Sequence, residues 1–135
     1  MVEDYIERQI DQLGKALRKW LSKIVTLREG GRELDSVANS IKTECDLDFA
    51  EVLRQNKNEV IGFLKKKGVA HKNLETIADL MLEFSKFESA APDRKLRLNQ
   101  SALEIFEYVE TLDTTFSLNR QSKITALKKI IEHLV

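Results

Sequence analysis

The segment IERQIDQLGKALRKWLSKIVTL, residues 6–27, carries the strongest pattern in this sequence. Its large apolar residues recur at alternating spacings of four and three, which is the heptad period of an amphipathic helix. They are Ile6, Ile10, Leu13, Leu17, Trp20, Ile24 and Leu27. Acidic residues precede the segment and Gly30-Gly31 follows it, as is typical of helix ends. The pattern predicts a long N-terminal helix over residues 3–28.

Gly14 interrupts this segment at a position where glycine is unfavourable. A glycine inside a helix costs about 1 kcal/mol relative to alanine. We therefore interpret Gly14 as a mark of close approach by another helix.

The composition points to one helical domain. The chain has 135 residues, 42% of them hydrophobic and 33% charged, which is the length of one domain and enough apolar material for a core. One Pro and five Gly are too few for the turns of an all-β fold, and a single Cys excludes a disulfide framework. The polar start and the lack of a long apolar run argue against a signal peptide and a membrane span. We expect a single all-α domain over residues 1–135, located in the cytoplasm.

Shorter helical patterns fill the rest of the chain. Two helices are expected over about 32–45 and 93–113, with a short element near 48–54. Further helices are expected to begin at caps formed by Asn56, Asn73 and Ser117. Together these patterns predict an all-α fold of about six helices arranged as antiparallel hairpins.

The second half of the chain, about residues 73–135, resembles a degenerate tetratricopeptide repeat, a helical hairpin of small and apolar residues at fixed spacing. The residues that carry the likeness are Leu74, Ile77, Ala78 and Met81 in the first helix and Ala102 and Phe106 in the second. This resemblance implies TPR-like packing in the second half. Stacked hairpins of this kind expose a concave groove that suits an apolar helix or peptide.

The layout is also similar to an uncharacterised family of small bacterial helical proteins. The similar segments are DYIERQIDQL at residues 4–13 and TFSLNR at residues 115–120. This second resemblance implies the helical fold and supplies no functional residues.

No residue pattern typical of an enzyme is present in the sequence. Cys45 completes an apolar stripe, and its only imidazole partners, His71 just before a helix and His133 in a final turn, are distant in sequence. A catalytic thiol needs a base within hydrogen-bond reach. We therefore predict a structural Cys45, no catalytic residue, no metal site and no cofactor.

Basic residues cluster in two places. The clusters are Lys15, Arg18, Lys19 and Lys23 on the long helix, and Lys65, Lys66 and Lys67 at the end of a shorter one. Such clusters bind nucleic-acid backbones, so a nucleic-acid-associated regulatory protein is the alternative function. The net charge of zero and the preference of lysine for helix ends weigh against it.

Acidic residues gather at positions 104–113. They are Glu104, Glu107, Glu110 and Asp113, and we interpret the glutamate ladder as a solvated helix face. Separate basic and acidic segments in a neutral chain favour helix packing or self-association over binding to a uniformly charged polymer.

We therefore predict a non-catalytic protein–protein interaction or scaffold domain. Tyr5, Trp20 and Leu21 are the expected contact residues, because Tyr and Trp contribute strongly at interfaces. By default the heptad forms part of the core of this chain. A homodimer through the N-terminal helix is the arrangement left open. The expected partner is a protein or peptide.

Overall fold

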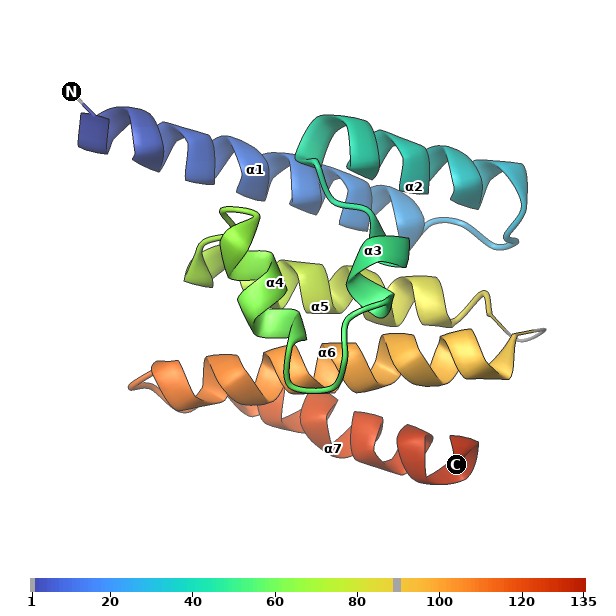
Figure 1. The fold of residues 1–135 in the computed structure, drawn as a ribbon. Coiled ribbons are helices and arrows are strands. Elements are labelled where there is room, and N and C mark those ends of the chain that lie inside the picture. Colours follow the sequence, from blue (N-terminus) through green and yellow to red (C-terminus); the bar gives the residue numbers. More distant parts are fainter. Residues whose placement is uncertain (1, 89–90) are drawn as a thin grey trace.

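The computed structural model describes residues 2–88 and 91–135, and over these residues the chain forms seven helices and no strand (Figure 1). In chain order they are α1 (Val2–Ile24), α2 (Arg32–Cys45), α3 (Phe49–Leu53), α4 (Val60–Lys66), α5 (His71–Ser85), α6 (Pro92–Leu112) and α7 (Leu118–Leu134). The predicted all-α class is confirmed, with one helix more than the expected count of about six.

The five longer helices form a row in the order α2, α1, α5, α6, α7, and α3 and α4 lie across one side of it (Figure 1). The pairs α1–α2, α5–α6 and α6–α7 are antiparallel hairpins, as predicted (Figure 1). The N-terminal end of α1 and the turn between α6 and α7 lie on the same side of the molecule, at the left in Figure 1. None of the helices in the described residues is long and apolar enough to cross a membrane.

The heptad contributes to the core of this chain from Leu13 onward. Leu17 and Ile24 are buried, and Leu13, Trp20 and Leu27 are half-buried against the same core. A dimer through the full length of the heptad is therefore not available, because the seam is already occupied. Residues 2–9 of α1 are all exposed.

Gly14 lies at the crossing of α1 and α5, where the predicted close approach is found. A Cβ atom at Gly14 would stand 2.8 Å from Oδ1 of Asn73. Only a residue without a side chain leaves room there.

Two of the predicted caps are wrong for tertiary reasons, and the third is confirmed. Asn56 does not begin a helix, since α4 starts at Val60 and the intervening Asn58 has a left-handed φ of 73°. Asn73 lies inside α5, where its buried amide donates to the carbonyl oxygen of Ile10 at 3.0 Å. The Ser117 hydroxyl accepts a hydrogen bond from the backbone N–H of Arg120 at 3.2 Å and caps α7 as predicted.

The first helix also ends earlier than predicted. Beyond Ile24 the backbone tightens, with the N–H groups of Thr26 and Leu27 donating to carbonyls only three residues back. The Thr26 hydroxyl donates to the same Lys23 carbonyl at 2.7 Å. These local bonds replace the last predicted turn of the helix.

Candidate partner-binding groove

A groove of about 530 Å³ runs between α1, α5, α7 and the first half of α6. Its apolar lining comes from segments far apart in sequence: Leu21 of α1 and Val25 just after it, Leu82 of α5, and Ala126, Leu127 and Ile130 of α7. Its polar lining is Asp79, Glu83, Ser85, Lys86, Lys95, Asn99 and Lys123. Grooves of this size and composition take apolar side chains of a ligand.

The groove uses the side of α5 that faces away from α3 and α4. On the core side, the Phe84 ring packs against Phe49 of α3 with centroids 5.1 Å apart. Because successive helical residues are rotated by about 100°, Asp79 and Leu82 lie on the opposite side. This side of α5, which carries Asp79 and Leu82, is half-buried and lines the groove.

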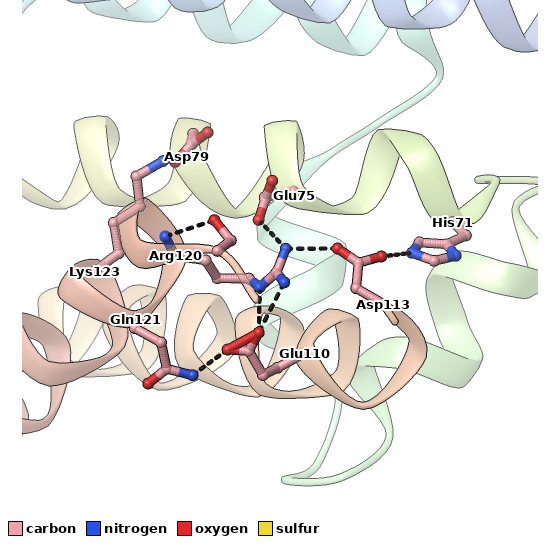
Figure 2. Close-up of polar contacts among 9 residues, drawn as sticks. His71, Glu75, Asp79, Glu110, Asp113, Arg120, Gln121 and Lys123 are labelled. Carbon is pink, nitrogen blue, oxygen red and sulfur yellow. Dashed lines mark hydrogen bonds and ion pairs between the residues drawn. The ribbon is translucent and has the colours of Figure 1, made fainter. Parts of the chain in front are cut away.

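The buried guanidinium of Arg120 fixes α7 beside this face of α5 (Figure 2). Arg120 is only 3% exposed, and its Nη1 donates to Glu75 of α5 at 3.0 Å and to Asp113 at 2.8 Å. Its Nη2 donates to Glu110 of α6 at 2.7 Å. These bonds lower the pKa of the Glu110 carboxyl and raise the pKa of Arg120. A charge this deeply covered is tolerated because three carboxylates surround it.

A second ion pair in the lining of the groove joins α7 to α5. Lys123 Nζ lies 2.7 Å from Asp79 Oδ1 (Figure 2). Burial raises the pKa of Asp79, and the hydrogen bond from Lys123 opposes that effect. At the rim, Lys86 Nζ lies 2.9 Å from Glu83 Oε1. Both carboxylates of the groove are thus neutralised, while Lys95 makes no ion pair within the described residues.

The three predicted contact residues do not form one site. Leu21 lines the groove, half-buried. Trp20 faces α2 instead, where its Nε1 donates to Glu44 at 2.8 Å. Tyr5 lies near the other end of α1 and is 60% exposed.

The basic residues proposed for nucleic acid lie on helices with different neighbours, since α1 packs on α2 and α5 whereas α4 packs on α3 and α6. Lys19 pairs with Glu44 at 3.2 Å, and Lys67 pairs with Glu51 at 3.4 Å. Lys65 lies over the Tyr108 ring, 4.6 Å from its centroid. The remaining members, Lys15, Arg18, Lys23 and Lys66, are exposed.

Cys45, His71 and His133 lie on three different helices, α2, α5 and α7. Cys45 ends α2 half-buried, and burial raises the pKa of its thiol to about 11. His71 is the first residue of α5, rather than preceding it as predicted, and its Nε2 lies 3.3 Å from Asp113 Oδ1. His133 is exposed in the last turn of α7, as predicted. Within the described part of the chain, no His, Cys, Asp and Glu side chains form a group that could hold a metal ion.

The glutamate ladder is not the solvated face that the sequence indicates. Glu110 binds Arg120, and Glu104 Oε1 accepts the backbone N–H of Asn58 at 2.6 Å. Glu107 alone of the three remains exposed.

Comparisons with known protein families, curated proteins and solved structures found no match for this chain.

Most groove residues were not predicted as contact residues. The apolar spacing of the sequence does not single out Val25, Leu82 or Ile130. The sequence feature that could have indicated the groove is an apolar stripe wider than one packing face. Leu21 and Val25 widen the stripe of the N-terminal helix in this way.

Proposed function

We propose that the protein is a non-catalytic protein–protein interaction domain whose groove binds one amphipathic helix of a partner. The observation that carries this proposal is that Val25, just after α1, and Ile130 of α7 line the same groove and remain 55% and 39% exposed. A groove between helices with exposed apolar side chains is the usual receptor for a helix that presents residues at i, i+3 and i+4.

The charges around the groove favour an acidic partner helix. Lys86, Lys95 and Lys123 line it against two carboxylates that are already paired. Lys95 is the lining cation left to meet an incoming carboxylate. Charge complementarity of this kind sets orientation and association rate more than affinity.

The ionisable groups of the groove also support binding rather than catalysis. Asp79 and Glu83 each face a lysine ammonium within 3 Å, at 2.7 and 2.9 Å. A carboxylate engaged in this way is a poor general base. The groove therefore offers contact surface and charge.

The nucleic-acid alternative has weaker support. Lys19 and Lys67 are engaged by carboxylates, and the two basic clusters lie on helices that pack against different neighbours. A continuous basic track along one face would be needed to follow a phosphate backbone.

The test is a titration followed by NMR amide shifts, with designed helical peptides of about four turns as probes. One peptide carries apolar residues at i, i+3, i+4 and i+7 with glutamates elsewhere; a second replaces the glutamates by lysines; a third scrambles the apolar positions. We expect the acidic peptide alone to shift the amides around Leu82, Lys95 and Ile130. A short duplex DNA at low salt is expected to shift none of them.

The matched variant is Val25→Glu/Ile130→Glu, which changes two exposed side chains and keeps the core intact. It should bind the acidic peptide at least tenfold more weakly, about 1.4 kcal/mol. Equal shifts from the scrambled peptide, or no shift from any peptide, would overturn the proposal. DNA-induced shifts centred on Lys19 and Lys66 would favour the nucleic-acid alternative instead.

A further inference from the structure

The first eight residues of α1, Val2–Gln9, form a helical end that this chain does not cover; we call it the N-terminal overhang. Every one of its side chains is exposed, including Val2 at 74%, Tyr5 at 60% and Ile6 at 48%. In Figure 1 the overhang ends the α1 rod at the side of the molecule occupied by the turn between α6 and α7.

The overhang has the pattern of an amphipathic ligand helix. Val2, Tyr5 and Ile6 stand at i, i+3 and i+4 and share one side of the helix. The acidic residues of the overhang, Glu3, Asp4 and Glu7, lie on the other side, with Arg8 as its only basic residue. Two helical turns with an apolar side facing water gain stability when a partner covers that side.

We infer that the partner helix of the groove is the N-terminal overhang of a second copy of this chain. This inference rests on the function proposed above and names the ligand of the same groove. The overhang presents apolar side chains at i, i+3 and i+4 and carries three carboxylates. The groove presents apolar side chains that can contact this apolar side and three lysines that can meet these carboxylates.

A copy cannot fill its own groove. The groove is lined by Leu21, near the C-terminal end of the same helix, and by Val25 just after that end. Some 18 residues of α1 separate Tyr5 from this part, which is about 27 Å at 1.5 Å per residue. The heptad holds α1 as one continuous helix against the core. The contact must therefore join two molecules.

The predicted contact is head to tail. Two overhangs brought together would oppose like charges, since each has three carboxylates and one guanidinium. An overhang against a groove opposes unlike charges instead. Each copy then offers one overhang and one groove, and such a heterologous contact extends into chains or closes into rings.

Sedimentation velocity over a dilution series of the full chain tests this arrangement. Three double variants change only exposed apolar side chains. The overhang variant is Tyr5→Ser/Ile6→Ser, the groove variant is Val25→Glu/Ile130→Glu, and the control is Phe116→Ser/Leu118→Ser at a surface outside both parts. We expect the wild type and the control to grow in mass with concentration. The overhang and groove variants are each expected to be monomers.

An equimolar mixture of the overhang variant and the groove variant is the decisive sample. The overhang variant keeps an intact groove, and the groove variant keeps an intact overhang. The mixture should form a heterodimer and nothing larger, because only one intact contact is present. Charge reversal supplies an independent check: Glu3→Lys/Glu7→Lys should weaken assembly at least tenfold, and added Lys86→Glu/Lys95→Glu should restore most of the loss.

Wild type that is monomeric at every concentration overturns the inference, as does a mixture that forms no heterodimer while the wild type assembles. Assembly abolished by the Phe116/Leu118 control would also overturn it. The two proposals fail separately. If the acidic peptide binds the groove of a protein that stays monomeric, the groove function stands and the second copy is excluded as its ligand.

Discussion

The side-chain amide of Asn73 donates to the backbone carbonyl oxygen of Ile10 at 3.0 Å, and this bond joins α5 to α1 beside Gly14. The carbonyl lies inside α1, so it already accepts from within its own helix. Asn73 is 2% exposed, and its Oδ1 faces the space above Gly14. A polar side chain, a backbone group and a missing Cβ together set how closely the two helices pack.

Gly14→Ala should destabilise the protein even though alanine favours helices. The gain in helix propensity is about 1 kcal/mol. The added methyl would lie 2.8 Å from Asn73 Oδ1, and overpacking at such a site costs about 1–3 kcal/mol. The buried Asn73 side chain is held by its bond to Ile10, so it has little room to move. Urea unfolding should show a net loss of about 1 kcal/mol.

The matched control is Gly62→Ala in α4, where a Cβ would meet nothing within 4 Å. This change should stabilise the protein by about 0.4–1 kcal/mol. If Gly14→Ala also stabilised it, the close approach would not be the reason for glycine at position 14.

The features that the sequence predicts well are those that depend on neighbouring residues. Ser117 caps α7 through a backbone N–H only three residues ahead. The hydrophobic pattern likewise locates the buried face of α1 from Leu13 to Ile24. Asn56 and Asn73 look like caps by the same local rules, yet distant contacts decide their surroundings. Next to Asn56, the backbone N–H of Asn58 donates to Glu104, 46 residues away, and Asn73 donates to Ile10, 63 residues away.

The groove was less predictable because it depends on where α7 lies. Leu21 was expected as a contact residue, whereas Ile130 joins it only after Arg120 has fixed α7. The three carboxylates that hold Arg120 come from α5, from α6 and from the turn after α6. No short-range pattern connects Glu75 with Arg120 across 45 residues.

Arg120→Met should be among the most destabilising single changes that leave side-chain volume nearly unchanged. It removes the cation shared by three carboxylates and leaves their mutual repulsion. Breaking a buried pair typically costs about 3–5 kcal/mol; because these carboxylates are partly exposed, we expect a loss of about 2–3 kcal/mol. Denaturant unfolding measures it.

Lys128→Met provides the control, because Lys128 and Glu107 are both more than half exposed and 4.0 Å apart. Its effect should stay within about 0.5 kcal/mol. Similar losses for both variants would mean that the Arg120 cluster contributes no more than an ordinary surface pair.

The contribution of Arg120 to stability should depend on pH. Its guanidinium holds the pKa of Glu110 below the ordinary value of 4.5, so the carboxylate stabilises the folded state above that value. This stabilisation is lost as the pH falls through 4.5 and on through the folded-state pKa.

The free-energy difference between the wild type and Arg120→Met should therefore be largest near about pH 7 and shrink below about pH 4. Asp79, whose pKa is raised, is present in both proteins and cancels in the difference. A difference that stays constant over this range would contradict the role given to Glu110.

Cys45 should react slowly with alkylating reagents while the protein is folded. Burial, reinforced by the negative charge of Glu44, raises the pKa of the thiol from 9.0 to about 11. At neutral to mildly basic pH this lowers the thiolate fraction roughly 100-fold, and the greater nucleophilicity of the remaining thiolate recovers part of the loss. Iodoacetamide should therefore modify the folded protein at least about tenfold more slowly than the urea-unfolded chain, as followed by intact mass.

Glu44→Gln should speed the reaction of the folded protein, and Lys19→Gln should slow it, because the two side chains act on the thiolate with opposite signs. Folded protein that reacts faster than the unfolded chain would identify an activated thiol and would contradict the structural role assigned to Cys45.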